Sequence, residues 1–393
     1  MIDFGFEIKK IFEDYDVNVQ GDSVVIDYKD WESELIFKYE QGKEEENLNY
    51  IIEELRRLKD AIYLDNGVCL YEDCCELLVT IPEMYRLLNF DGYSLDFKSI
   101  RSVDKIVYDI GNISDTFLNI LQIKGYFNDL SEILTTLKIY NTFSDSDGPP
   151  SDLELLKQKV DHVAKMILFE LSYKYSVELK LIDIPEDDDD YDPIFDMTEK
   201  LNSIKAPFLN GNYDRDLIEY YYRAIQMPHN EFKYLAFYQV LECLFDEVYI
   251  SDTVQDVMAI INSGWFSSYN SEHIGEIISI VEQYSKSKND REKLRLVLDK
   301  YFRCNTHDEA FMVANQDIVE ILRERLEKIT KPEELKDLQK LANIIYDYRC
   351  CLTHSNRKYP YRVTIEATPE ELDAYIELVK KLSERVIMNY SAT

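Results

Sequence analysis

The chain has 393 residues with 76 acidic and 44 basic side chains, a net charge of −32. This length suits two or three domains. An apolar content of 46% is too high for a disordered chain. The negative net charge argues against sequence-independent coating of DNA, because it repels phosphate. No apolar run is long enough for a transmembrane helix, and the acidic start lacks the basic segment of a secretory signal. Seven cysteines without a C-x-x-C pair are typical of reduced thiols, so we expect a cytoplasmic protein with neither a disulfide framework nor a zinc site.

Residues 1–145 are predicted to form an α+β domain with a sensory or regulatory role. Apolar residues alternate over 17–26 around Gly21, which is typical of a β-hairpin, and the alternation continues over 31–39. Apolar positions spaced by three and four predict helices, and one short apolar run predicts a strand. The expected helices are 43–62, 114–123 and 130–140, and the expected strand is 106–110.

A helix-strand extension over residues 151–205 is predicted to follow a polar linker. Residues 144–150 are rich in Ser and Asp and end in glycine and two prolines, which break helices. A calcium loop is the alternative, because the acids there have suitable offsets, but Phe143 occupies the first ligand position. A capping box opens a predicted helix at 151–175, and alternation predicts a strand at 177–184.

An acidic loop at residues 186–192 interrupts this extension. Its adjacent carboxylates repel one another and prefer water, so a solvated loop is the simplest interpretation. The alternative is an autoinhibitory strip that mimics RNA phosphate and occupies a basic site. Metal binding has less support, because nothing nearby in the sequence fixes a coordination geometry.

Residues 213–393 are predicted to form an all-α domain. Residues 211–393 hold 23 basic and 31 acidic residues, whereas residues 1–210 hold 21 and 45. The two halves therefore differ enough in charge to have different roles. The expected helices cover 216–226, 231–248, 253–263, 271–286, 290–302, 316–329, 332–351 and a last segment that begins with a capping box at Thr368 and Pro369.

One stretch of this second half reverses the acidic character of the chain. Between Tyr348 and Tyr361 the sequence has three basic residues, one histidine and no acid. The pair Arg349 and His354 stands near the end of a long amphipathic helix. A local positive patch of this kind attracts phosphate.

The two side chains have the chemistry for RNA cleavage without a metal. A guanidinium grips a phosphodiester with two donors, and an imidazole exchanges a proton with a ribose 2′-OH or a leaving 5′ oxygen. A spacing of five corresponds to about 140° around a helix, so Arg349 and His354 line two sides of a groove or meet where the helix ends. A second copy across a two-fold axis could complete one composite site. The simpler interpretation is a salt-bridged helix end at which the histidine interacts with the helix dipole.

A glutamate in an earlier apolar helix supports the first interpretation. Glu242 lies in the segment 231–248, which is apolar on nearly every side, and a carboxylate there is costly to bury without a partner. Arg349 is the expected partner, and Arg223 is the alternative.

Residues 213–390 resemble a HEPN domain (higher eukaryotes and prokaryotes nucleotide-binding), most closely the Apea-like HEPN group. The resemblance rests on residues 222–224 with 232–242, on the spacing R-x(4–6)-H from Arg349 to His354, and on the closing helix from Pro369. It implies an all-α bundle, a homodimer with a composite site, and metal-independent endoribonuclease activity without a cofactor. Members commonly act as toxins or in anti-phage defence.

The resemblance also assigns the residues of the site. Arg349 and His354 match the two motif residues, and Glu242 matches the internal glutamate of the first helices. Cys350 follows the arginine, where many active members carry Asn or Asp, and is a further supporting position.

Basic and aromatic residues beyond the motif are candidates for RNA binding. Arg357 and Lys358 would steer RNA. Four tyrosines bracket the motif and are candidates to stack on exposed bases: Tyr346, Tyr348, Tyr359 and Tyr361. We expect at least Tyr359 or Tyr361 to do so. With 30 tyrosines in the chain, several near any site are also expected by chance.

Three hypotheses follow. The first is an endoribonuclease that acts on RNA as a homodimer, with an inhibitory or triggering partner at its N-terminal region and no membrane association. The second is a non-catalytic HEPN module that binds RNA or a partner protein, and the third is a structural adaptor that works through its acidic N-terminal surface.

Overall fold

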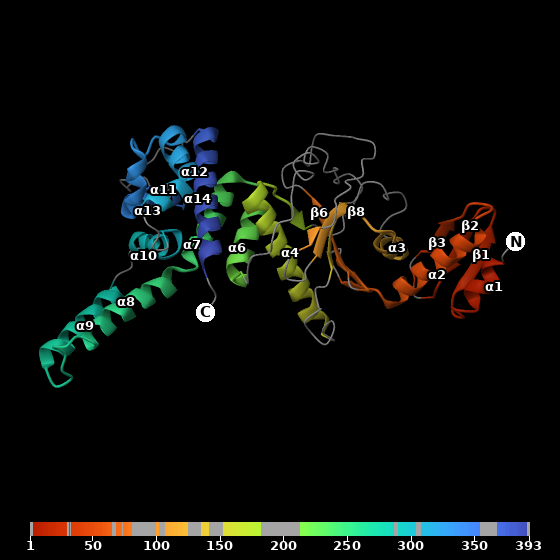
Figure 1. The fold of residues 1–393 in the computed structure, drawn as a ribbon, viewed down its shortest axis with the longest axis horizontal. Coiled ribbons are helices and arrows are strands. Elements are labelled where there is room, and N and C mark those ends of the chain that lie inside the picture. Colours follow the sequence, from red (N-terminus) through yellow and green to blue (C-terminus); the bar gives the residue numbers. More distant parts are fainter. Residues whose placement is uncertain are drawn as a thin grey trace. The chain divides into compact units, whose positions relative to one another are not determined.

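The chain forms two compact units, residues 1–210 and 211–393. The first contains antiparallel sheets with helices and the second is largely helical (Figure 1), which confirms that an α+β region precedes a helical one. The computed structural model describes residues 3–29, 31, 33–64, 68–72, 74–80, 100–101, 107–124, 135–140, 152–181, 213–286, 290–303, 308–353 and 368–390.

The first unit begins with a small three-stranded sheet in the order β1-β2-β3. The hairpin at 17–26 is confirmed: Val19 pairs with Val24, and Gly21 takes a positive φ of 66° in the turn, where a side chain would be strained. The elements of this part are α1 (Phe4–Lys9), β1 (Asp16–Gln20), β2 (Ser23–Asp27), β3 (Leu35–Lys38) and α2 (Glu44–Asp60).

Helix α2 forms where the sequence predicts a helix at 43–62. Three glutamates occupy its first turn, and Arg57 and Lys59 lie in its last turn, so both ends carry charges that complement the helix dipole. Its apolar face is buried through Leu48, Ile51 and Leu55 in the core that the small sheet shares with α1 and α3 (Asp115–Ile123).

A seven-stranded antiparallel sheet forms the rest of the first unit. The strands follow the order β4-β5-β6-β9-β8-β7, and β10 pairs with β6. The predicted strand at 106–110 is confirmed by β8. The strands are β4 (Ile62–Leu64), β5 (Val68–Tyr71), β6 (Cys74–Thr80), β7 (Ile100–Arg101), β8 (Val107–Asn112), β9 (Thr135–Tyr140) and β10 (Lys180–Leu181).

The helix predicted at 130–140 is wrong over its described part. Residues Thr135–Tyr140 form β9, which pairs with β6 on one side and with β8 on the other. The segment begins with two threonines and is rich in branched and aromatic residues, which suit a pleated surface, and pairing on both sides overrides its helical spacing.

Helix α4 (Leu153–Tyr175) confirms the helix predicted at 151–175. Its N-cap is Asp152, whose carboxylate accepts from the backbone N–H of Glu154 and Leu155. Ser151 was predicted to be the cap and lies outside the described residues. An aspartate cap satisfies two of the free N–H groups of the first turn.

The second unit is a bundle centred on α7, which packs against α6, α13 and α14. Its elements are α6 (Arg215–Gln226), α7 (Asn230–Glu242), α8 (Phe245–Ile261), α9 (Ser271–Lys286), α10 (Asp290–Val297), the π-helix η2 (Leu298–Arg303), α11 (Asp308–Ala314), α12 (Gln316–Glu320), the π-helix η3 (Ile321–Arg325), the 3₁₀-helix η4 (Pro332–Lys336), α13 (Leu338–Thr353) and α14 (Pro369–Asn389).

Buried hydrogen bonds fix α7 to its neighbours. The hydroxyl of Tyr234 donates to the carbonyl of Ile345 in α13 at 2.8 Å, and the hydroxyl of Ser383 in α14 donates to the carbonyl of Phe237 at 3.0 Å. Both hydroxyls are paired with backbone carbonyls of a neighbouring helix, so these bonds specify the register between α7, α13 and α14 as well as stabilising it.

Several predicted helix limits change in this unit. Helix α7 ends at Glu242 and α8 begins at Phe245, so the predicted helix at 231–248 is two helices. The helix predicted at 253–263 is the C-terminal part of α8. Leu244, Phe245 and Val248 are buried, and this burial redirects the chain. The helix predicted at 332–351 starts as η4 and continues as α13 after Asp337, whose carboxylate accepts from the N–H of Lys340. The capping threonine of α14 is confirmed.

Candidate functional site

Arg349 lies in the last turns of α13. The last buried residues of this helix are Ile345, Tyr348 and Cys350, and Arg349 lies between the last two at the edge of the buried face. The side chain of Arg349 is 23% exposed. A guanidinium in this position is held by packing along its stem while its donors remain within reach of solvent.

Glu242, the last residue of α7, is the ionic partner that the sequence predicts for Arg349. The distance from its Oε1 to Nη2 of Arg349 is 3.7 Å, which is an ion pair but too long for a hydrogen bond. The alternative partner is wrong, because Nε of Arg223 bonds to Glu219 at 3.1 Å. Glu242 and Arg349 therefore face each other from two helices without locking together.

Tyr238 lies one turn before Glu242 on α7. Its ring faces the guanidinium carbon of Arg349, which is 5.8 Å from the ring centroid, a distance at which a cation is attracted by the ring. The side chain is 1% exposed, yet its hydroxyl has no hydrogen-bond partner among the described residues. We refer to Arg349, Glu242 and Tyr238 as the Arg349 cluster.

Burial and mutual charge shift the pKa values in the Arg349 cluster. Burial raises the pKa of Glu242, the charge of Asp290 adds to this effect, and Arg349 opposes it. Burial by itself would lower the pKa of Arg349, but the neighbouring groups, of which Glu242 contributes most, together outweigh that effect and raise it. Burial and the Glu242 charge both raise the pKa of Tyr238. The arginine is therefore a permanent cation beside a carboxylate that is poorly solvated.

The donors of Arg349 make no hydrogen bond to a residue that the structure describes. Within the described part of the chain, its guanidinium makes the ion pair to Glu242 and the ring contact with Tyr238, and no hydrogen bond. Arg385 in α14 shows the opposite arrangement, with hydrogen bonds to the side chains of Asn315 and Asp317 and to the carbonyl of Ala314. Because a guanidinium has five N–H donors in a fixed fork, Arg349 retains the capacity to bind an oxyanion.

Other residues of the motif region face the core. Tyr348 is buried and stacks on Tyr375 with a centroid separation of 3.6 Å, so the interpretation of Tyr348 as a base-stacking residue is wrong. Tyr346 lies under the guanidinium of Arg291, 5.0 Å from ring to cation. Cys350 is buried and interacts with the side chain of Tyr346.

The remaining predicted site residues lie outside the described residues. These are the motif histidine, the basic and aromatic residues after it, and the acidic loop. They comprise His354, Arg357, Lys358, Tyr359, Tyr361 and residues 186–192.

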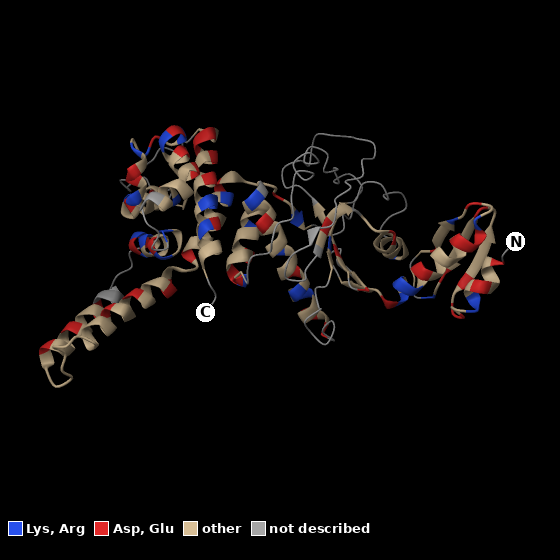
Figure 2. Cartoon of the chain, viewed as in Figure 1, with Lys and Arg blue, Asp and Glu red and all other residues tan. Residues whose placement is uncertain are grey.

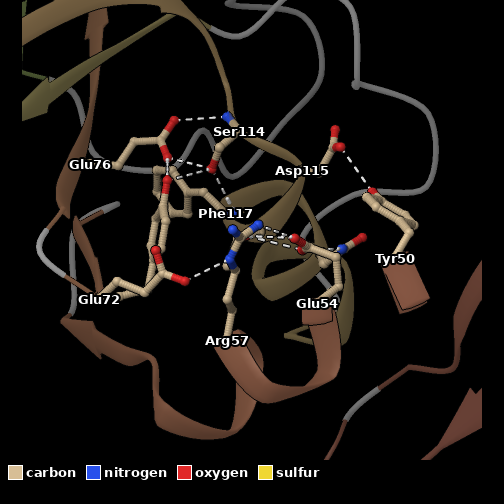
Figure 3. Close-up of polar contacts among 11 residues, drawn as sticks. Tyr50, Glu54, Arg57, Glu72, Glu76, Ser114, Asp115 and Phe117 are labelled. Atoms are coloured by element: carbon tan, nitrogen blue, oxygen red, sulfur yellow. Dashed lines mark hydrogen bonds and ion pairs between the residues drawn. The ribbon is translucent and has the colours of Figure 1, made fainter. Parts of the chain in front are cut away.

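A second polar cluster, which the sequence patterns do not predict, lies in the first unit. Glu76 on β6 is fully buried, and its carboxylate accepts from the hydroxyl and the N–H of Ser114 at 2.5 and 2.8 Å, from Thr136 at 2.7 Å and from Tyr71 at 2.9 Å. Lys138, its cross-strand neighbour, lies 3.9 Å away. Figure 3 shows Glu76 facing Ser114, the N-cap of α3. The signal in the sequence was a single glutamate within the apolar run of β6. We refer to these five residues as the Glu76 cluster.

A neighbouring group of charges ties α2 to the same region (Figure 3). Arg57 bonds to Glu54 and Glu72, each at 2.8 Å. The buried Glu54 also accepts from Thr116 on α3 at 3.0 Å, and Tyr50 donates to Asp115 at 2.8 Å. Because each of the buried carboxylates has protein donors, this region of the first unit is a structural junction.

No family model, curated protein or solved structure matches the chain. Among the described residues, no group of three or more His, Cys, Asp or Glu side chains could hold a metal ion. The described helices also include none that is long and apolar enough to cross a membrane.

Proposed function

We propose that this protein is a metal-independent endoribonuclease of the HEPN type, in which Arg349 binds the phosphate of RNA and His354 transfers the proton. In this reaction the ribose 2′-oxygen attacks phosphorus and the bond from phosphorus to the 5′ oxygen breaks. The products are a 2′,3′-cyclic phosphate and a free 5′-hydroxyl. The proton of the 2′-OH is removed and one is delivered to the leaving oxygen, so His354 serves on one of these two sides.

The single observation that supports this proposal is the open guanidinium of Arg349. It is held in place from behind by the ring of Tyr238 and attracted by Glu242, while its N–H donors make no hydrogen bond to a described residue. Donors that are fixed before the reaction stabilise charge that develops on phosphate oxygens without further reorganisation. Phosphate binding would replace the loose ion pair with Glu242 by shorter, charge-assisted hydrogen bonds.

Other parts of the proposal follow from the sequence. Arg357 and Lys358 would steer RNA to the site, and Tyr359 and Tyr361 would stack on its bases. Two chains would share one composite site, and release of such an enzyme in a cell would be toxic.

The experiment is an RNA cleavage assay with purified full-length protein in the presence of EDTA. Wild-type protein is expected to cut mixed RNA into fragments with cyclic phosphate ends, and His354→Ala is expected to lose this activity. His229→Ala is the matched control, because His229 is an exposed histidine of the same unit without a side-chain cap bond at the start of α7.

Two results would contradict the proposal. One is undiminished cleavage by His354→Ala. The other is RNA binding by the wild-type protein with no cleavage under any condition, which would favour the non-catalytic HEPN module.

A further inference from the structure

Helices α8 and α9 form a hairpin arm in the second unit, from Phe245 to Lys286 (Figure 1). The first turns of α8 belong to the bundle, where Phe245 and Val248 are buried. From residue 249 to residue 282, every residue is at least partly exposed. A segment of this size that buries no core of its own gains little from hydrophobic burial, and structures this small usually depend on association.

The arm exposes a row of large aliphatic side chains. On α8, four such residues recur at spacings of three and four, and at about 100° per residue they fall within an arc of about 80°. On α9, two more lie three apart. Their side chains are between 41% and 53% exposed. We define the arm stripe as Ile250, Val254, Met258 and Ile261 of α8 with Ile278 and Val281 of α9.

Both halves of the arm stripe lie on one face of the hairpin. On α8, the side that packs against α9 carries the partly buried residues Thr253, Val257 and Ile260. Around the helix axis, the stripe residues of α8 lie about a quarter turn from this side. On α9, the partly buried Ile277 and Ile280 form the side that packs against α8. The stripe residues Ile278 and Val281 are displaced from this side around the helix axis in the same sense as on α8. Because the helices are antiparallel, equal rotations place both halves on the same face.

The tip of the arm is an ordered turn. The N–H of Ser267 donates to Nδ1 of His273 at 3.0 Å, and the ring of Trp265 meets His273 edge-on with a centroid separation of 4.7 Å. These contacts fix the angle between the two helices. The arm stripe is therefore presented on a preformed surface, which lowers the entropic cost of association.

Most of the charge of the arm lies away from the arm stripe. Residues 245–286 hold seven acids and one lysine, and Figure 2 shows the arm mostly in tan with red positions. Asp252 and Asp256 point about 180° away from the centre of the stripe. At the base, Asp246 pairs with Lys293, and Glu247 accepts from the hydroxyls of Tyr301 and Tyr390.

The residues beside the stripe are mostly uncharged. Ser251, Gln255 and Asn262 border it on α8, and the exposed Glu282 borders it on α9, one turn after Ile278. A basic peptide bound to the stripe would be on the opposite side of α8 from its acidic residues. An anionic membrane would be repelled by the net negative charge of the arm. A second copy of the same face meets neither obstacle.

We infer that the arm stripe is a self-association surface, on which the arms of two copies of this chain pack face to face as a four-helix bundle. Six half-exposed aliphatic side chains with their polar rim offer on the order of 500 Å² per copy, or about 1,000 Å² in the pair, which is the lower limit for a specific interface. The pairing is isologous, so each stripe residue meets the stripe of the other copy across a two-fold axis.

The test is the mass of the full-length protein in solution, measured by sedimentation equilibrium at micromolar concentrations. Val254→Glu places two carboxylates near the centre of the interface and is expected to weaken association about 100-fold. Ala259→Glu is the matched control, because it adds the same charge five residues along α8 at an exposed position outside the stripe. A photo-reactive residue at position 258 is expected to give a covalent dimer joined arm to arm.

The inference fails if the wild-type chain sediments as a monomer, or if Val254→Glu associates as strongly as Ala259→Glu. It also fails if the cross-link at position 258 captures a different protein or lipid instead of a second arm. A dimer formed only around α13 would survive Val254→Glu, and this outcome would overturn the arm interface while leaving the proposed nuclease intact. Loss of RNA cleavage in His354→Ala is independent of both results.

Discussion

The Glu76 cluster and the Arg349 cluster each place a charged side chain against apolar packing, and they differ in how its hydrogen bonds are satisfied. In the first unit, four donors and a nearby lysine surround the carboxylate of Glu76. In the second unit, Arg349 has an ion pair and a ring contact, and the Tyr238 hydroxyl has no described partner. Glu76 is fully buried, whereas Arg349 is 23% exposed, so the group with the greater burial is the one whose hydrogen bonds are satisfied.

The difference teaches that unused hydrogen-bonding capacity is the informative property. A saturated buried charge holds secondary structure in place, and it leaves nothing for a ligand to bind. An unsaturated buried group costs stability in the free protein, and binding of a complementary ion recovers this cost. Six substitutions, grouped in four experiments, test this contrast, and their expected effects decrease in the order given.

Glu76→Ala is expected to have the largest effect. It leaves Ser114, Thr136, Tyr71 and Lys138 without their common acceptor, and removal of one member of a buried charged network costs about 3–5 kcal/mol. Chemical denaturation followed by circular dichroism measures this loss. Glu72→Ala is the control, because Glu72 is 60% exposed and its loss should change stability by less than about 1 kcal/mol.

Arg349→Ala and Arg385→Ala are expected to have opposite consequences. The first should lower the RNA cleavage rate about 10²–10³-fold, as the loss of a preorganised donor does, with little change in unfolding. The second should cost about 2 kcal/mol of stability, because charged hydrogen bonds are lost, while the refolded protein keeps its cleavage rate. Equal effects of both substitutions on activity would remove the contrast.

Tyr71→Phe and Tyr238→Phe remove the same hydroxyl from the two clusters. Tyr71→Phe deletes a hydrogen bond to Glu76 and should destabilise the protein by about 1 kcal/mol. Tyr238→Phe deletes a buried hydroxyl without a described partner, so it should leave stability unchanged or raise it by up to about 1 kcal/mol. Thermal unfolding of the two variants in parallel shows whether the signs differ.

Glu242→Gln is expected to change the pH dependence of stability by a small amount. The pKa of Glu242 is raised above its ordinary value of 4.5 in the folded chain, so the folded state holds more protons than the unfolded state above pH 4.5. Stability that is present below this pH is therefore lost in the wild type as the pH rises through the raised pKa. Glu242→Gln has no carboxyl group that titrates at this position. Its free energy of unfolding should therefore rise relative to that of the wild type as the pH increases through the raised pKa of Glu242.

The gain should stay below about 1 kcal/mol, because solvent screens a group that is 39% exposed. Unfolding curves of both proteins at several pH values measure it. A difference that falls as the pH rises would contradict the stated environment of Glu242.

Local patterns in the sequence were sufficient for many elements. The glycine turn at Gly21, the helical period of α2 and the threonine cap of α14 act over a few residues, and the structure has each of them where predicted. The pairing of Glu242 with Arg349 was also predictable, since a carboxylate in an apolar helix is costly to bury without a cation and Arg349 flanks the apolar stripe of a later helix.

Other features depended on contacts that sequence spacing does not show. The segment at 135–140 is a strand because β6 and β8 flank it, and the break before α8 follows from burial of Leu244 and Phe245. The Glu76 cluster joins residues from β5, β6, α3 and β9, so its signal in the sequence was a single acid in an apolar run.

Periodicity, capping and the cost of burying charge act within short segments, so the order of an α+β region before a helical one, most helix starts, and the pair of Arg349 and Glu242 were predictable from the amino-acid sequence. Only the tertiary structure decided which polar groups are saturated and which remain open, because hydrogen bonds between distant segments form only when packing brings donor and acceptor within about 3 Å. The same packing exposed the arm stripe, since whether an amphipathic face is covered depends on which other helices reach it.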